Sequence, residues 1–245
     1  WADVEANLQK VDEQLAQLSG HTDLVVLPEM FTTGFCTDKL HLAEPMDGHT
    51  VKTLRSWAQK YQLAITGSFM AAENRKVYNR AFFVFPSGHV ETADKRHLFN
   101  PGDENLHFTR GDKRLVVKYC DFSICVLVCY DIRFPVWSRN VDNEYDLLVY
   151  VANFPQRRIR DWDILLQARA IENQAYVCGV NRVGVDALGI EYDGHSALLD
   201  FKANSLLPFH ENKTSVYTAE ILPKPLKVYR EKFPVWKDAD KFQIK

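Results

Sequence analysis

The feature that most constrains the fold of this chain is a series of short, uninterrupted apolar runs. DLVVLPEM at 23–30, SICVLV at 123–128 and DLLVYVANFP at 146–155 each hold several aliphatic residues in succession and then stop. A strand that is covered on both faces has this pattern, whereas a strand with one solvent-exposed face alternates apolar and polar residues. The chain therefore needs a sheet whose two faces are both covered.

Segments with helical spacing separate these runs. Residues 1–19, 50–61 and 161–174 place apolar side chains at intervals of three or four, which predicts amphipathic helices. Further strands are predicted at 63–69, in two parts of 77–90, in a hairpin-like pair within 114–135 that leads into a sharp turn, and at 175–184, 195–201 and 214–222. Strands and helices alternate without a low-complexity linker, so we predict a single α/β domain.

The two ends of the chain depart from this pattern. Residues 223–245 are rich in lysine and proline and have no clear place in a core. We therefore expect a surface arm or an inter-subunit strap after a domain that spans residues 1–222. Trp1 leads straight into the first predicted helix, whereas elsewhere a strand comes before each helix. We therefore expect the natural protein to have an additional strand ahead of residue 1.

Composition restricts the classes of function. The 245 residues carry a formal net charge of -2 with no long basic run, which argues against nucleic-acid binding. No apolar run approaches the ~20 residues of a membrane span, and no signal-peptide pattern opens the chain. The five cysteines form no CxxC pair, which argues against a disulfide framework and favours a reducing compartment. We expect a cytoplasmic globular protein.

Cys129 is the candidate nucleophile, because it follows the run SICVLV and opens the segment CYDIRFP. We expect it at the end of a buried strand, where open α/β sheets carry their reactive groups. A thiol on such a turn can face a pocket, but it is mostly protonated at neutral pH and needs a nearby base or cation. Core packing is the alternative for any cysteine, and we favour it for Cys120, Cys125 and Cys178.

Two charged residues are candidates for that base and that cation. Glu29 follows Val-Val-Leu-Pro at the end of another predicted strand, and Lys95 lies in DKRHLF just after the predicted hairpin. Either residue alone is more often a solvated surface charge. Together with Cys129 they supply the acid, base and nucleophile that acyl transfer requires.

Three segments, LPEMFTTGF, DKRHLF and VCYDIRFP, resemble the signatures of the nitrilase (carbon–nitrogen hydrolase) superfamily in sequence and in order. VANFP, ARAIENQAY, GVNRVG and YDGHS resemble its omega-amidase branch, so the resemblance covers essentially the whole chain. It implies a four-layer α-β-β-α sandwich in which a strand precedes a helix such as 1–19. It also implies a homodimer or larger homo-oligomer that pairs through helices and C-terminal segments.

The resemblance also implies roles for the matching residues. Glu29 corresponds to the general base, and Cys129 corresponds to the nucleophile that forms a thioester. Lys95 corresponds to the lysine that stabilises the tetrahedral oxyanion together with the backbone N–H of Tyr130. Glu104, in ENLHFTRG, corresponds to a second glutamate that orients Lys95 and the substrate amide, although a loop surface charge is the alternative. No cofactor is implied.

Other chemistries have less support. The eight histidines show no HxH or HExxH spacing, which argues against a metal hydrolase, and no Gly-x-Ser-x-Gly elbow or P-loop is present. We expect His97 to pack or to form hydrogen bonds rather than to act as the base. Asp131 and Arg133 are expected to form a structural ion pair or a cap that shapes the turn after Cys129.

Omega-amidases remove the terminal amide from short dicarboxylic monoamides such as 2-oxoglutaramate and 2-oxosuccinamate. The far carboxylate of such a substrate needs a cationic or N–H-rich partner. Arg157 and Arg158 are candidates for that partner, with an exposed basic pair as an equal alternative. Phe31, Phe35 and Phe154 are candidates for the pocket walls, although phenylalanine is also a common core residue.

Two other functions remain open. The first is another carbon–nitrogen hydrolase, such as an aliphatic amidase, a nitrilase or an N-carbamoyl amidohydrolase. The second is a catalytically silent binding protein of the same fold, which would predict the loss of a catalytic residue, yet Glu29, Lys95 and Cys129 are all present. In each enzyme reading the partner is a small amide-like molecule, and neither nucleic acid nor a membrane is expected.

Overall fold

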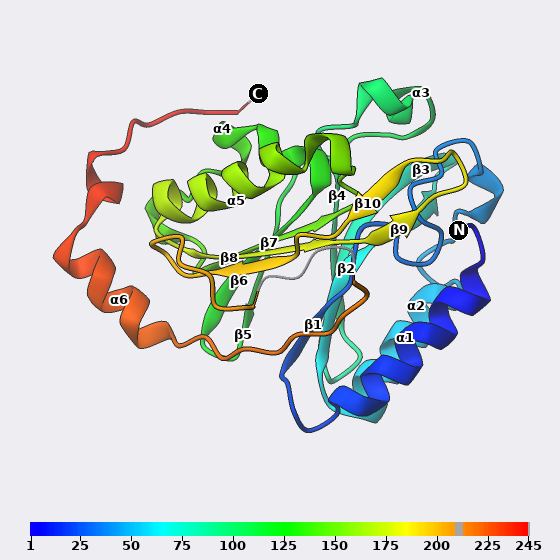
Figure 1. The fold of residues 1–245 in the computed structure, drawn as a ribbon, viewed down its shortest axis with the longest axis horizontal. Helices are drawn as coiled ribbons and strands as arrows, with labels where there is room; N and C mark the ends of the chain where they lie inside the picture. The colour runs from blue at the N-terminus through cyan, green and yellow to red at the C-terminus, as the bar shows by residue number, and fades with distance from the viewer. Residues whose placement is uncertain (209–212, 245) are drawn as a thin grey trace.

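The computed structural model describes residues 1–208 and 213–244, and it arranges them in four layers (Figure 1). Helices α1 (Val4–Leu18) and α2 (His49–Tyr61) cover one face of a sheet with the strand order β1-β2-β3-β4. A second sheet, ordered β11-β8-β7-β6-β5, packs on its other face, and α5 (Ile159–Asn173) covers the far side. The predicted α-β-β-α sandwich is confirmed.

The first sheet begins with a short edge strand. β1 (Leu24–Val26) runs parallel to β2 (Ala64–Glu73), and β3 (Lys76–Val84) and β4 (Val90–Asp94) continue as an antiparallel meander. The three residues of β1 are only half-buried, so the prediction of a strand covered on both faces is wrong there. In the described part of the chain, β1 pairs with β2 alone, so its other edge has no strand partner.

The second sheet carries the strands that the long apolar runs predict. β5 (Leu115–Tyr119) and β6 (Phe122–Val128) form an antiparallel pair. β6, β7 (Leu147–Ala152) and β8 (Tyr176–Asn181) are parallel, and β11 (Ala197–Leu199) closes the sheet. Every residue of β7 is buried, as its uninterrupted run predicts. The parallel order brings the carboxyl ends of β6, β7 and β8 to the same edge.

Apolar side chains fill each boundary between layers. Ala81 and Phe83 of the first sheet belong to the same buried cluster as the side chains of β6 and β7. On α5, Trp162, Leu166 and Ala170 share one face of the helix and pack onto the second sheet. Burying apolar area on this scale is the main favourable contribution to folding, at roughly 25 cal/mol for each Å² removed from water.

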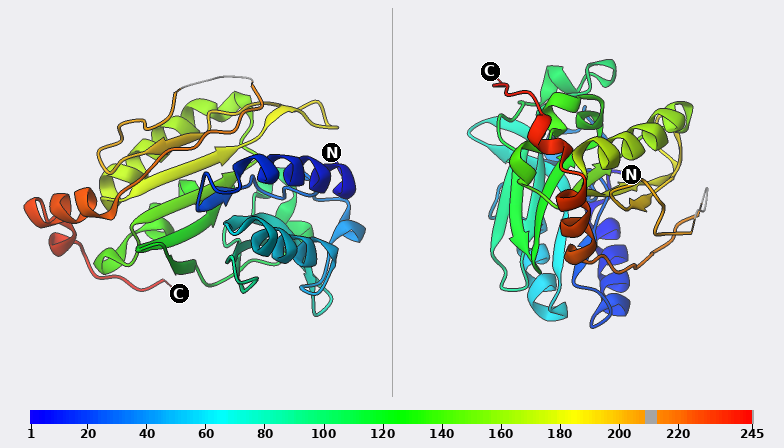
Figure 2. Two further views of the ribbon diagram at one scale, coloured as in Figure 1. Left: turned by 90° about the horizontal axis from the view of Figure 1, so that it is seen from below. Right: turned by 90° about the vertical axis from the view of Figure 1, so that its left-hand side faces the viewer.

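The C-terminal part of the chain differs from the sequence prediction. Residues 213–222 form no strand, so the prediction of a strand at 214–222 is wrong. Ser205 and Leu206 instead bond to the outer edge of β11. α6 (Pro223–Lys232) lies at one end of the molecule (Figure 2). Its Leu226 is fully buried, and Arg230 donates to Asp146 at 2.7 Å, so this helix does contact the core. The domain boundary at residue 222 stays a prediction.

Short elements complete the fold. β9 (Val183–Val185) and β10 (Glu191–Asp193) form a two-stranded ribbon, and α3 (Glu104–His107) and α4 (Pro135–Ser138) are single turns. Among the helices of the described residues, none combines the length and apolar character that a membrane crossing requires. All five cysteines are free; Cys125 is buried as predicted, whereas Cys120 is exposed in the β5–β6 turn and the prediction of core packing is wrong for it.

Candidate active site

Four residues from distant parts of the sequence meet near the carboxyl ends of the strands. Glu29 lies in the loop after β1, Lys95 directly follows β4, Glu104 opens α3, and Cys129 directly follows β6. Their exposed fractions are 1%, 2%, 0% and 9%, respectively, so water is largely excluded. The sequence-based grouping of Glu29, Lys95 and Cys129 is therefore matched by a shared buried location, and Glu104 is not a loop surface charge.

Lys95 joins the two carboxylates. Its Nζ lies 2.9 Å from Oε1 of Glu29 and 2.9 Å from Oε2 of Glu104, and all three side chains are fully buried. Glu104 also accepts the backbone N–H of Phe99 at 2.6 Å. Because removing charges from water is costly, such a cluster is stable only when its charges are paired and hydrogen-bonded. Here one ammonium serves two carboxylates.

The two carboxylates differ in proton affinity. Burial would raise the pKa of Glu29, but Lys95 and the N–H groups of Asn153 and Asn79 outweigh it, so this pKa is lowered. Burial and the charge of Glu29 outweigh Lys95 at Glu104, whose pKa is raised. Burial opposes the Lys95 ammonium, but Glu104 and Glu29 together raise its pKa. Glu29 is therefore the carboxylate that holds its negative charge and can accept a proton.

Cys129 sits on a sharp turn between β6 and a 3-10 helix, Cys129–Arg133. Its backbone φ is 45°, a conformation that is strained for a residue other than glycine. Asp131 supports the turn, because it accepts the N–H of Val128 at 3.1 Å and that of His97 at 3.0 Å. The predicted capping role of Asp131 is confirmed. The predicted ion pair with Arg133 is not formed, since Arg133 donates to Asp161 at 2.6 Å.

Burial and the neighbouring Glu29 raise the pKa of the Cys129 thiol, and Lys95 only partly opposes them. The resting group is therefore the thiol, which needs a base for attack. Its Sγ lies 4.0 Å from the backbone oxygen of Asn153. A buried thiol beside an anionic carboxylate and an ammonium can pass its proton to the carboxylate as it attacks an electrophile.

His97 has the packing role that the sequence predicts. Its ring stacks on Phe134 with 3.7 Å between centroids, and its Nδ1 lies 2.8 Å from Asp131.

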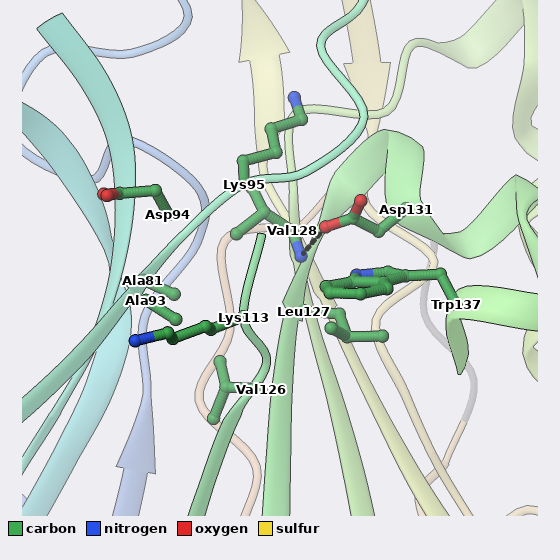
Figure 3. A pocket seen from close by; sticks show the side chains of 10 residues that line it. All are labelled: Ala81, Ala93, Asp94, Lys95, Lys113, Val126, Leu127, Val128, Asp131 and Trp137. Atoms are coloured by element: carbon green, nitrogen blue, oxygen red, sulfur yellow. Dashed lines mark hydrogen bonds between the residues drawn. The ribbon is translucent and has the colours of Figure 1, made fainter. Parts of the chain in front are cut away.

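A cavity of about 10 Å³ lies between the two sheets near His97. Lys95 is one of the residues that line it, and its ammonium points away from the other lining side chains (Figure 3). That volume holds at most about one water molecule, so this cavity is not a substrate site.

Two asparagines that the sequence analysis missed complete the hydrogen bonding. Asn79, on β3, donates from Nδ2 to Glu29 at 2.8 Å and to Glu104 at 3.0 Å. Asn153, directly after β7, donates its backbone N–H to Oε2 of Glu29 at 2.9 Å and its Nδ2 to the Glu29 backbone oxygen at 2.8 Å. Two features of the sequence could have identified them: Asn79 is a polar residue within an otherwise apolar strand, and Asn153 stands at the end of a buried strand.

The predicted pocket phenylalanines divide between the site and the core. The Phe35 ring lies 5.4 Å from Nζ of Lys95, next to the charged cluster. Phe31 instead packs in the core under α1 and α2, with its ring 5.8 Å from that of Phe82. Phe154 is buried against Trp162, also within a core cluster. The ring contact of Phe35 with Lys95 therefore supports a place at the site for that residue.

The two candidate arginines also differ. Arg157 is exposed, whereas Arg158 is half-buried and its guanidinium lies 5.0 Å from the centre of the Phe99 ring. Phe99 in turn contacts the ring of Tyr130, the residue after Cys129, at 5.1 Å. Within residues 1–208 and 213–244, no cluster of three or more His, Cys, Asp or Glu side chains could hold a metal ion.

Comparisons with known proteins agree with this geometry. The family model described as carbon–nitrogen hydrolase matches residues 1–231. The omega-amidase YafV of Escherichia coli K12 is 43% identical over 244 residues, which cover 100% of this chain and 94% of that protein. The 2-oxoglutaramate amidase of Bacillus subtilis is 32% identical, and the match covers 96% of this chain and 92% of that protein.

A solved structure gives the same result. The CN-hydrolase superfamily protein XC1258 from Xanthomonas campestris, which carries an arsenic adduct in its active site, matches with a TM-score of 0.97 and 39% identity. The match covers 100% of this chain and 95% of that chain. The four layers described above therefore recur in a protein of the same superfamily.

Replacing Lys95 by methionine should leave Glu29 and Glu104 buried without their cation. We expect Lys95→Met to lower the free energy of unfolding at pH 7 by about 3–5 kcal/mol. Both carboxyl pKa values would then lie above their unfolded values, so their protonated forms favour the folded state and stability is lost as pH rises. Urea denaturation at pH 6 and pH 8 measures this effect. The free energy of unfolding of Lys95→Met should fall farther below that of the wild type at pH 8 than at pH 6.

Lys113 provides the matched control, because it lines the small cavity near Lys95 but is exposed. Lys113→Met should change the free energy of unfolding by no more than about 0.5 kcal/mol at either pH. A Lys95→Met variant as stable as the wild type at pH 8 would contradict the buried ion cluster.

Proposed function

Because the chain belongs to the carbon–nitrogen hydrolase family, we propose that it is an omega-amidase acting on the terminal amide of short dicarboxylic monoamides such as 2-oxoglutaramate. The observation that carries the proposal is the Cys129 thiol beside a Glu29 carboxylate that Lys95 keeps anionic. The likeness to the E. coli omega-amidase and the B. subtilis 2-oxoglutaramate amidase supports the substrate class.

Acylation begins at Cys129. Its Sγ–H proton passes to Glu29 while the sulfur electron pair forms a bond to the amide carbon. The developing oxyanion is stabilised by the Lys95 ammonium and the backbone N–H of Tyr130 in a site that excludes water, where such interactions are strong. The C–N bond then breaks, and ammonia leaves with the proton that Glu29 returns. A thioester on Cys129 remains.

Deacylation reverses these roles. Glu29 takes a proton from a water molecule, whose oxygen attacks the thioester carbon, and the C–S bond breaks to release the dicarboxylic acid. The proton returns to Cys129. Glu104 keeps Lys95 in place through both steps by its contact with Nζ. The two steps use side chains and one backbone N–H of this chain, the substrate and one water molecule.

Two further properties accompany this function. We propose a cytoplasmic location, which fits five cysteines that are all free.

We also propose a homodimer or larger homo-oligomer. The reason is that Ile164 and Ile171 of α5 lie on the face away from the core, where their exposed fractions are 52% and 57%. Sedimentation of the purified protein measures this state, and a monomer at all concentrations would contradict it.

The proposed reaction can be tested by ammonia release. We expect turnover of 2-oxoglutaramate, and much slower release from an aliphatic nitrile or an N-carbamoyl amino acid. Cys129→Ala should lower kcat by about 10⁴-fold or more, because the nucleophile is lost, whereas Cys120→Ala, at the exposed cysteine, should leave kcat unchanged. No turnover of 2-oxoglutaramate would reject the substrate class, and native-rate release by Cys129→Ala would reject the nucleophile.

Arg158 is the residue that we propose to bind the distal carboxylate of the substrate. Burial lowers its pKa, and so do the charges of Arg157 and Arg133, which Cys129 and Tyr192 only partly oppose. No carboxylate of the described residues pairs with it, whereas Arg133 already pairs with Asp161. A guanidinium in this state gains most from a charged, planar carboxylate.

The Arg158 proposal predicts a substrate-dependent loss. Arg158→Ala should raise KM for 2-oxoglutaramate by roughly 10- to 100-fold, the effect of one charge-assisted hydrogen-bond pair. Turnover of an uncharged amide of similar length should change little. The neighbouring Arg157→Ala, at an exposed position, is the control and should leave both substrates unaffected. Equal losses on the charged and uncharged amides would contradict the proposal.

A further inference from the structure

Asn181 is the last residue of β8, and it stands beside Ala152, the last residue of the parallel strand β7. Its exposed fraction is 6%. Beyond Ala152 the chain continues into Asn153 and Phe154, which belong to no strand. The buried side chain of Asn181 therefore lies at the point where the backbone pairing of β7 with β8 ends.

The side-chain amide of Asn181 continues the hydrogen bonding past that point. Its Oδ1 accepts the N–H of Phe154 at 2.7 Å, and its Nδ2 donates to the Phe154 backbone oxygen at 2.9 Å. Nδ2 also donates to the backbone oxygen of Gly194 at 2.8 Å. Both amide hydrogens and the amide oxygen are thus in use. An ionised aspartate of the same shape could accept the first bond but could donate neither of the others.

The residue that Asn181 holds adjoins the base of the site. Asn153 precedes Phe154, and its backbone N–H donates to Glu29 at 2.9 Å. The backbone oxygen of Asn153 lies 4.0 Å from Sγ of Cys129. This oxygen and the N–H of Phe154 belong to one planar peptide group. A rotation of that peptide would therefore break the bond to Asn181 and move the Asn153 oxygen away from the thiol.

Asn140 has the same arrangement at the other end of β7. Its Oδ1 accepts the N–H of Tyr145 at 3.2 Å, and its Nδ2 donates to the backbone oxygens of Tyr145 at 2.9 Å and of Asn173 at 3.1 Å. Its exposed fraction is 4%. The two buried asparagines thus make the same three kinds of bond, but only Asn181 bonds to a residue next to the active site.

We propose that Asn181 is a positioning residue for the reaction: by holding Phe154, it keeps Asn153 bonded to Glu29 and keeps the Asn153 carbonyl beside the Cys129 thiol. This inference deepens the proposed function and rests on it. The side chain of Asn181 bonds to Phe154 and Gly194, so it acts on the base through the backbone. Catalytic groups need such support, because a displacement of about 1 Å can cost roughly 100-fold in rate.

The test replaces Asn181 by aspartate, which keeps the shape of the side chain but loses both donor hydrogens. The first measurement is the rate at which iodoacetamide, itself a small primary amide, alkylates Cys129 at pH 7. Mass spectrometry quantifies the modified peptide. Alkylation should slow by roughly ten-fold or more, because the buried thiol loses a correctly placed base.

The second measurement is turnover of 2-oxoglutaramate. In Asn181→Asp, kcat should fall by roughly 100-fold and KM should change much less, because the proton acceptor is displaced. Asn181→Ser keeps one hydroxyl, which can bond to one backbone group of Phe154. Its rates of alkylation and turnover should lie between those of the wild type and Asn181→Asp.

Asn140→Asp is the matched control, because it loses the same kinds of bond at the opposite end of β7. Both aspartate variants should unfold at a lower urea concentration than the wild type, since each leaves buried carbonyls without donors. Only Asn181→Asp should react slowly. Asn140→Asp should keep its alkylation rate and kcat within about two-fold of the wild type.

Native rates of alkylation and turnover in a folded Asn181→Asp or Asn181→Ser variant would overturn the proposal. So would equal losses in Asn140→Asp and Asn181→Asp, which would show a general loss of structure, or a failure of both Asn181 variants to fold. Alkylation needs no substrate, so it tests the proposal even if 2-oxoglutaramate is the wrong amide. That error would show in the wild type, as normal alkylation without ammonia release.

Discussion

The buried contact of Lys95 with Glu29 and Glu104 is the interaction on which the rest of the structure depends. Two carboxylates and one ammonium lie where water does not reach, so each needs its partners at short range. The residues come from the loops after two strands of one sheet and from α3, and the nucleophile comes from the other sheet. Only the packing of the two sheets face to face brings all four together.

The two carboxylates share one cation, but their other surroundings differ. Glu29 accepts hydrogen bonds from the N–H groups of Asn153, and its pKa is lowered. At Glu104 the effect of burial exceeds the effect of the neighbouring cation and N–H donors, so its pKa is raised. A single lysine between two equivalent acids would leave the position of the negative charge undetermined. The asymmetry of the hydrogen bonds therefore assigns the charge to the glutamate nearer Cys129.

Much of this could be predicted from the sequence, because the informative patterns were local. The uninterrupted run of β7 and the helical spacing of α5 identify their elements, and Glu29, Lys95 and Cys129 stand at strand ends. The half-burial of β1 and the missing strand at 214–222 depend on contacts with distant parts of the chain, which no local pattern records. Asn79 and the difference between Arg157 and Arg158 depend likewise on neighbours distant in sequence.

The parallel pairing of β6 with β7 has a consequence for substrate size. The nucleophile follows β6, and the loop with Arg158 follows β7, so a substrate bound as proposed lies across two adjacent strands. Hydrogen bonding fixes the separation of such strands at about 4.8 Å. The separation of the two strands is therefore fixed by the backbone. A protein with this fold would accept a longer dicarboxylic monoamide by placing its carboxylate-binding arginine farther from the nucleophile, because the spacing of the strands cannot change.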